Sequence, residues 1–406
     1  RAGDALTDAD HNVAVGQQAL SSDTLGSRAV AIGQGALFTQ NFTTATQHYN
    51  VAVGYEAGNK ITAGQQNTLI GGLAGDALTD ADKNTAVGMQ ALTTDTLGSK
   101  STAIGQNALK VQNFTTATDT FNTAVGFEAG AAVTTGIRNT IMGGLAGDAL
   151  TDADLNVVMG YNALSSDTLG SGSIAIGQGT LHTQNFTTAT TTNNVAVGYN
   201  TGGAVTTGIQ NTLIGGGAGD ALTDADFNVA IGYNALSSDT LGSRSTAIGR
   251  SALTTQNFTT ATDTGNVAVG FNAGVAVTTG TNNVLIGTEA GDSITSGNTN
   301  VAMGTLALAT NQQGDRNTAV GYKALEDMNP SGNVDTYNTA VGFFAGTAVT
   351  TGVQNTLIGG LAGDALTDAD FNVAVGYAAL TADTLGSRSV AIGQSALGTQ
   401  NFTTAT

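Results

Sequence analysis

A four-residue motif of the type Val13–Gly16 (VAVG) occurs 22 times in this chain at strictly regular intervals. Successive motif glycines are 17, 21, 17 and 17 residues apart, and the series then repeats, so that the true period is 72 residues. An acidic segment, Gly75–Asp82 (GDALTDAD), returns with the same period at Gly147 and Gly219. Regularity of this kind is typical of a repeat array in which each repeat packs on its neighbours. It argues against an ordinary globular enzyme.

Each motif has the length and composition of a short β-strand. In the rung that begins at Asn84, the apolar residues Thr85–Val87 follow the asparagine and end at Gly88. We number these residues, in every rung, as positions 1 (Asn84) to 5 (Gly88). A run rich in Val, Ile and Thr, bounded by Asn or Ser and by Gly, indicates a strand with turns at both ends. The later patch Ala91–Leu92 is the candidate for a second, returning strand.

The sequence therefore predicts an all-β fold, a parallel β-solenoid of about 22 rungs, without an internal domain boundary. We expect one solenoid over residues 1–406. Because the chain starts and stops in the middle of a repeat, we also expect it to be a window of a longer protein. The 72-residue repeats and the partial ones are 12–83, 84–155, 156–227, 228–299, 300–371, 1–11 and 372–406.

Alternate residues of a strand face opposite sides, so positions 2 and 4 share one face and position 3 lies on the other. Position 4 is Val, Ile or Met in every rung, which predicts that it faces the core. Position 3 is mostly Ala, and a strand with water on one side would carry polar residues there. We therefore expect position 3 to be buried against another chain. The residues predicted to form the core are Val15, Val87, Ile104, Val125 and Ile231.

Composition and charge narrow the functional class. Thirty acidic against 12 basic residues give a net charge of −18, which disfavours binding to nucleic acid or to an anionic membrane. No apolar run is long enough to span a membrane as a helix, so we expect no membrane insertion. The chain has no cysteine, which is compatible with an extracellular protein that does not use disulfides.

The string Asn228–Leu236 (NVAIGYNAL) resembles the head repeats of YadA-type trimeric autotransporter adhesins and repeats in long tail fibres of marine bacteriophages. The resemblance covers essentially the whole chain. It implies a left-handed parallel β-roll in which three chains pack side by side about a common axis. Adhesin heads have shorter rungs than the 17 and 21 residues found here, which favours a phage fibre over an adhesin head.

The 21-residue rung carries an insertion with the sequence Asn-Phe-Thr-Thr-Ala-Thr. Insertions in solenoids form loops on one face, often the face that binds. The phenylalanines could therefore form a ladder that contacts a receptor glycan or a neighbouring fibre. The simpler interpretation is that each one folds inward, closing an open edge of the roll or bracing the trimer. The phenylalanines concerned are Phe42, Phe114, Phe186, Phe258 and Phe402.

The acidic turn offers the oxygen ligands that Ca²⁺ prefers. Its spacing matches neither an EF-hand loop nor a calcium-binding solenoid repeat. Asp side chains also accept hydrogen bonds from the backbone of turns, which needs no metal, and this is the interpretation we favour. We therefore expect no cofactor, with calcium as the alternative. The candidate ligands are Asp76, Asp80, Asp82, Asp148, Asp152 and Asp154.

We expect no enzymatic activity. The three histidines, His11, His48 and His182, occupy non-equivalent places in their repeats, and no cysteine accompanies them. A catalytic triad or a zinc site needs several such groups that converge. An array of near-identical rungs also lacks the single irregular pocket that most active sites require.

The functional expectation is a structural fibre or shaft of a phage tail or virion appendage that extends a receptor-binding tip. Its partner would be itself, as a homotrimer, with a host receptor or glycan bound outside this window. The alternative is a bacterial cell-surface trimeric adhesin that binds host or matrix through its repeat face. A third reading, an ice- or glycan-binding solenoid, needs ranks of outward Thr-x-Thr. Threonine here alternates with valine at position 2 and is expected to face inward.

Overall fold

The computed structural model describes residues 1–404, which form an all-β parallel β-solenoid of about 22 turns. Every regular element in this part of the chain is a β-strand, so no helix is present that could cross a membrane. The chain divides into two compact units, Arg1–Thr207 and Gly208–Thr406, and each is described by itself.

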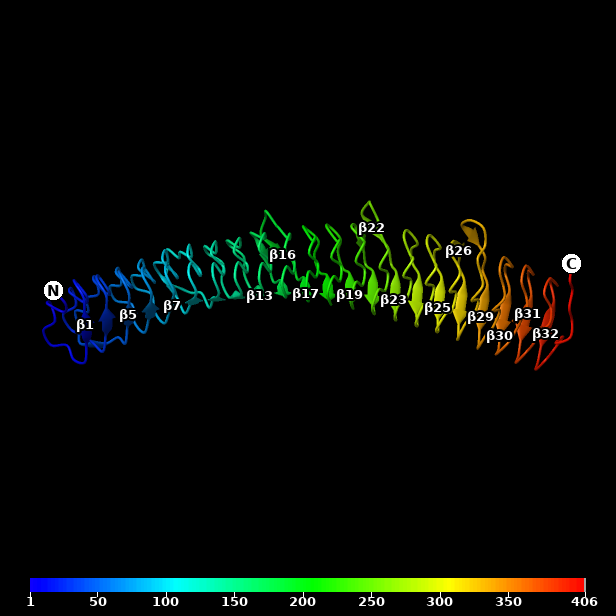
Figure 1. The fold of residues 1–406 in the computed structure, drawn as a ribbon, viewed down its shortest axis with the longest axis horizontal. Helices are drawn as coiled ribbons and strands as arrows, with labels where there is room; N and C mark the ends of the chain where they lie inside the picture. The colour runs from blue at the N-terminus through cyan, green and yellow to red at the C-terminus, as the bar shows by residue number, and fades with distance from the viewer. Residues whose placement is uncertain (405–406) are drawn as a thin grey trace. The chain divides into compact units, whose positions relative to one another are not determined.

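The first unit is a column of three-residue strands, each contributed by positions 2 to 4 of one rung (Figure 1). Neighbouring strands are parallel and in exact register, with position 3 beside position 3, as in the pairs Ala86↔Ala103 and Ala124↔Ile141. The strands, in the order in which they pair, are β1 (Val13–Val15), β3 (Val30–Ile32), β5 (Val51–Val53), β6 (Thr68–Ile70), β7 (Thr85–Val87), β9 (Thr102–Ile104), β11 (Thr123–Val125), β12 (Thr140–Met142), β13 (Val157–Met159), β15 (Ile174–Ile176) and β17 (Val195–Val197).

The second unit repeats this arrangement with the same parallel register. Its strands, again in pairing order, are β18 (Thr212–Ile214), β19 (Val229–Ile231), β21 (Thr246–Ile248), β23 (Val267–Val269), β24 (Val284–Ile286), β25 (Val301–Met303), β27 (Thr318–Val320), β29 (Thr339–Val341), β30 (Thr356–Ile358), β31 (Val373–Val375) and β32 (Val390–Ile392).

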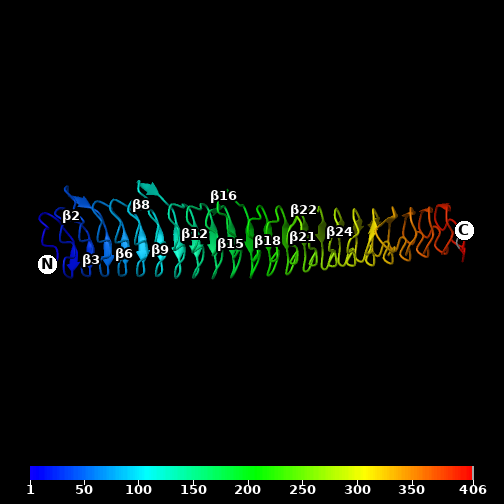
Figure 2. The ribbon, with the colours of Figure 1, turned by 90° about the horizontal axis from the view of Figure 1, so that it is seen from above.

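Two-residue strands pair wherever a 21-residue rung lies next to a regular one. In the first unit their ribbons project from the side of the column, near the labels β2 and β8 in Figure 2. The pairs are β2 (Gly26–Ser27) with β4 (Thr46–Gln47), β8 (Gly98–Ser99) with β10 (Thr118–Asp119), β14 (Gly170–Ser171) with β16 (Thr190–Thr191), β20 (Gly242–Ser243) with β22 (Thr262–Asp263), and β26 (Gly314–Asp315) with β28 (Val334–Asp335). Our expectation of a returning strand at Ala91–Leu92 was wrong, because these residues form a buried turn.

The two faces of the strand are the reverse of our prediction. Position 3 faces the interior, and Ala86, Ala103 and Ala124 are completely buried within the chain itself. Positions 2 and 4 face outward, so the residues predicted to form the core do not do so. Val15 and Ile104 are exposed, whereas Val87, Val125 and Ile231 are half-buried. The physical reason is volume: a 17-residue coil encloses little space, so alanine fills position 3 in most rungs, and larger residues such as Ile141 and Val158 are buried there in only a few.

The few larger residues at position 3 confirm how tightly this interior is filled. Leu69 occupies position 3 in a rung whose neighbouring turns carry Gly58 and Gly75 instead of the usual leucine. A Cβ added at Gly58 or at Gly75 would lie 2.7 Å or 2.8 Å from the Leu69 methyl groups. A large strand residue therefore compensates for small turn residues, which keeps the packing density constant along the column.

The asparagines at position 1 form a buried ladder. The backbone N–H of Asn84 donates to Oδ1 of Asn67, and the side-chain amide of Asn84 donates to the carbonyl of Gly98, both at 2.9 Å. Asn139 and Asn156 repeat these contacts one period later. Each asparagine thus ties its own strand to the rung before it and the rung after it. Backbone groups at the turn that would otherwise be buried without partners are satisfied in this way.

Candidate functional site: the outer face and the looped rungs

The side chains at positions 2 and 4 form an uncharged surface of Val, Ile, Met and Thr, which we call the outer face. It is exposed in both compact units: Val15 is 56% exposed, Ile104 38% and Ile358 41%. The sequence places only Thr, Val, Ile and Met at these two positions, and no charged residue at either. Soluble monomers rarely expose a contiguous apolar surface that recurs rung after rung, so the outer face is a candidate interface.

Threonine at position 2 lies on the outer face and not inside, which corrects our reason for setting aside an ice- or glycan-binding surface. Five consecutive rungs carry it, from Thr68 to Thr140. Position 4 beside it is always Val, Ile or Met, so the ranks read Thr-x-Val and never Thr-x-Thr. The Thr-x-Thr ranks that such a function would need are therefore absent, for a different reason than the one expected.

Aromatic and cationic side chains border the outer face along the residue before position 1. These side chains stack across neighbouring rungs: the Arg28 guanidinium lies 5.5 Å from the Tyr49 ring centre, and the Lys100 ammonium 5.1 Å from that of Phe121. Arg244 with Phe227 continues this border in the second unit. Contacts of this kind stabilise exposed cations by about 0.5–1 kcal/mol. Lys100 also forms an ion pair with Asp119, and Arg244 forms one with Asp263, so the positive charge of this border is balanced by carboxylates.

A second row of aromatics borders the other edge of the outer face, directly after the position 5 glycine. Its members recur every 72 residues and are about half exposed: Tyr55, Phe127, Tyr199, Phe271 and Phe343. Sequence reasoning missed both borders, although the period of this second row was available as a signal.

The phenylalanines of the looped rungs do not form an exposed ladder. Phe42, Phe114, Phe186 and Phe258 are only 6–8% exposed, and Phe402, in the last rung of the described residues, is 43% exposed. Four of the five rings therefore cannot contact a receptor, and the ladder interpretation is wrong for them. The inward interpretation is confirmed, because each loop folds its ring back against the column.

A buried aspartate holds each of these loops in place. Oδ1 of Asp95 accepts hydrogen bonds from the backbone N–H of Gly98 at 3.0 Å and of Phe114 at 3.1 Å. Oδ2 accepts the side-chain amide of Gln112 at 2.6 Å. The same amide also donates to Oγ of Ser101 at 2.9 Å. Asp95 and Gln112 are completely buried, and both oxygens of the Asp95 side chain are satisfied by N–H donors.

Replacing Asp95 with alanine is expected to detach the loop from the column. The change leaves the N–H groups of Gly98, Phe114 and Gln112 buried without acceptors, at a cost of about 3–5 kcal/mol. Hydrogen exchange at residues 112–122 should accelerate strongly, while the exchange of residues 184–194, anchored by Asp167, should stay unchanged. Equal protection of the two loops in the variant would contradict this role.

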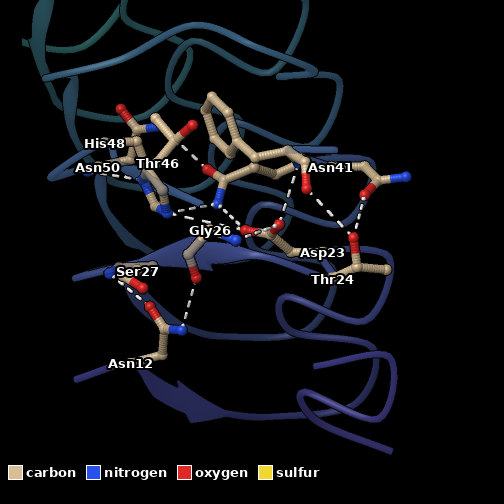
Figure 3. A network of polar contacts seen from close by, with 12 residues as sticks. Asn12, Asp23, Thr24, Gly26, Ser27, Asn41, Thr46, His48 and Asn50 are labelled. Carbon is tan, nitrogen blue, oxygen red and sulfur yellow. Dashed lines mark hydrogen bonds and ion pairs between the residues drawn. The ribbon is translucent and has the colours of Figure 1, made fainter. Parts of the chain in front are cut away.

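The first repeat builds the same anchor from different residues, and Figure 3 shows its network. Ala29 stands where the second repeat has Ser101, and His48 takes the place of Thr120. The His48 ring is completely buried and stacks on Phe42, with ring centres 4.8 Å apart. Its Nε2 atom lies 3.0 Å from Nε2 of Gln40 and 3.7 Å from Oδ2 of Asp23. Burial lowers the pKa of His48 to about 4, although the Asp23 carboxylate opposes this shift.

The fifth repeat lacks the three residues that form this anchor in the second repeat. Asn311 replaces the aspartate, Met328 replaces the glutamine, and Pro330 stands in the loop in place of the phenylalanine. The Asn311 side chain pairs with Gly314 alone, accepting from its N–H at 2.8 Å and donating to its carbonyl at 2.9 Å. Carboxylate, amide and ring thus change together, which shows that they work as one unit.

The aspartates of the acidic turns have different partners, and Oδ1 of Asp148 is buried without a hydrogen bond. Oδ1 of Asp82 accepts the N–H of Gln65 at 2.8 Å, and Oδ1 of Asp154 accepts that of Ile137 at 2.8 Å. Asp76 and Asp152 accept hydroxyl groups, from Thr93 and Thr135. Within residues 1–404 no group of three Asp, Glu, His or Cys side chains converges to hold a metal ion. The other two predicted calcium ligands are Asp80 and Asp148. Desolvation raises the pKa of Asp76 and of Asp148.

The histidines lie in separate surroundings. His48 belongs to the buried anchor just described, and Nδ1 of His182 lies 2.7 Å from the hydroxyl of Ser165. The comparisons with known proteins add nothing to this picture, since neither a protein-family model nor a curated protein sequence matches the chain.

Proposed function

We propose that this chain is the shaft of a homotrimeric extracellular fibre, such as a phage tail or virion appendage, which holds a receptor-binding tip away from the particle. The observation that carries the proposal is the outer face, an uncharged apolar surface that recurs in every rung of a chain whose interior is already filled by its own alanines. Burying such a surface between chains stabilises an assembly by about 25 cal/mol per Å² of apolar area.

Our sequence-based argument for a trimer used the wrong face of the strand, because the side chain at position 3 is buried within its own chain. The need for a partner surface persists, and positions 2 and 4 now supply it. The bordering cations and aromatics suit the rim of such an interface, where Arg, Tyr and Phe are enriched. A bacterial trimeric adhesin remains the alternative, because it would use the same association and differ only in what the fibre contacts.

Cysteine labelling tests the association directly, because the natural chain has no cysteine. Val125→Cys places a thiol on the outer face, and Thr116→Cys places one on the exposed loop of the preceding rung. In a trimer we expect maleimide to react with Val125→Cys roughly tenfold more slowly than with Thr116→Cys, since interface cores exclude water. Light scattering should give the mass of three chains. A monomer mass with similar labelling rates would rule the proposal out.

A further inference from the structure

The first compact unit contains a hollow of about 180 Å³ that neither the fibre role nor the loop anchors use. It opens beside the turns that follow β13, β15 and β17. Three consecutive rungs contribute to its lining, with Tyr161 and Asn162 from the first, Gln178, Gly179 and His182 from the second, and Asn200 from the third.

The hollow lies beside Gly179, which has no side chain. The equivalent residue of the second repeat is Asn107, whose amide donates to Glu128 at 3.1 Å. The first repeat also has glycine there, Gly35, and an added Cβ would lie 3.1 Å from the side chains of both Glu56 and Asn59. At Gly179 the nearest atom to an added Cβ would be Oδ1 of Asn200, at 2.7 Å. An asparagine at residue 179 would therefore displace the Asn200 side chain from its place in the hollow.

The frame of the hollow is held by the backbone. The N–H of Gly179 donates to the carbonyl of Tyr161 at 3.1 Å, and the N–H of Asn200 donates to that of Gln178 at 3.0 Å. His182 is fixed by Ser165 of the preceding rung, 2.7 Å away. These contacts set the spacing of the lining residues before any ligand arrives, which lowers the entropic cost of binding.

The lining chemistry selects a class of ligand. Asn162, Gln178 and Asn200 each present an amide that both donates and accepts hydrogen bonds, which matches the hydroxyl groups of a sugar. Tyr161, 54% exposed, adds an aromatic ring against which an apolar sugar face can pack. The lining contains no carboxylate, lysine or arginine, and the net charge of −18 disfavours anions.

We propose that the hollow around Gly179 binds one ring of a neutral saccharide, through the Asn162, Gln178 and Asn200 amides and the Tyr161 ring. The volume suits a single monosaccharide residue and is well below that of sites for larger ligands. All residues of the site come from one chain, and Tyr161, which directly follows the position 5 glycine Gly160, also borders the outer face.

Histidine NMR provides the test, because His182 is one of only three histidines in the chain. The full-length protein, labelled with ¹³C at histidine Cε1, would be titrated with the methyl glycosides of glucose, galactose, mannose and N-acetylglucosamine. We expect at least one of them to shift the His182 signal saturably, with a dissociation constant in the millimolar range that is typical of one small open site. The signals of His11 and His48 should not move.

The matched control is Gly179→Asn, which installs the residue of the second repeat and is compatible with the φ of +66° at Gly179, since Asn107 has a φ of +62°. Its Cβ would displace the Asn200 side chain, whose Oδ1 lies 2.7 Å away, and the variant should bind at least tenfold more weakly while keeping the circular dichroism spectrum of the natural chain. If none of the four glycosides shifts the His182 signal, or if the Gly179→Asn variant binds as tightly as the natural chain, the saccharide site is wrong.

Discussion

Replacing Gly71 with alanine is expected to disrupt its rung, whereas the same change at Gly72 should be nearly neutral. Gly71 is a position 5 glycine with a φ of +135°, and a Cβ there would lie 2.4 Å from the carbonyl oxygen of Gly88. That obstacle is backbone, which cannot move without breaking the strand pairing. Backbone strain and overpacking together should lower the local free energy of unfolding by on the order of 3–5 kcal/mol.

The adjacent Gly72 makes a strict control, because an added Cβ would meet nothing within 4 Å. Urea unfolding followed by circular dichroism, together with hydrogen exchange of β6 and β7, would measure both variants. Stability in a repeat array is local, so the loss should be concentrated in the rungs around Gly71. If Gly71→Ala and Gly72→Ala had similar stability, the stacking of position 5 glycines would not be what fixes the motif.

The second large effect concerns acidification of the first repeat. The pKa of buried His48 is lowered from 6.5 to about 4, so the folded state resists a proton that the unfolded chain accepts. The free energy of unfolding that this anchor contributes is therefore fully present above about pH 6.5, and it is lost as the pH falls towards 4. With 1.36 kcal/mol for each pH unit, the loss reaches about 3 kcal/mol.

The double variant Ala29→Ser, His48→Thr is the matched control, since it restores the Ser and Thr pair found in the second repeat. It should abolish the loss of protection in residues 40–50 between pH 6.5 and 4, while the anchors at Asp95 and Asp167 behave alike in both proteins. Hydrogen exchange corrected for intrinsic rates would measure protection, and histidine NMR would follow the titration. A His48 that titrates near pH 6.5 in the natural chain would contradict the prediction.

The repeat pattern was sufficient to predict the solenoid. The two-residue period of a β-strand places positions 2 and 4 on the same face. Once the rungs are in register, Asn84 and the asparagines at the same position in other rungs stack on one another. The alternation of side chains along a strand does not determine which of its two faces is buried in the interior. Both faces are apolar, and we assigned the interior to the larger residues, whereas a narrow coil selects the smaller ones.

The buried loop anchor was harder to predict. A charged Asp95 and an amide Gln112 inside a core contradict the usual expectation for buried residues, so neither stood out in the sequence. A comparison of the repeats with one another carried the missing signal. Asp, Gln and Phe disappear together in the fifth repeat, and Ser and Thr are exchanged together for Ala29 and His48 in the first.

The asparagine ladder also makes the length of the protein adjustable. Asn84 and Asn156 occupy the same position, and each accepts and donates to equivalent groups of the neighbouring rungs. If residues 84–155 were deleted and residue 83 were joined to residue 156, the donors of the asparagine ladder at the junction would find equivalent acceptors. Loss or gain of one 72-residue repeat therefore keeps the ladder contacts at the junction, so the length of the column can change in fixed increments.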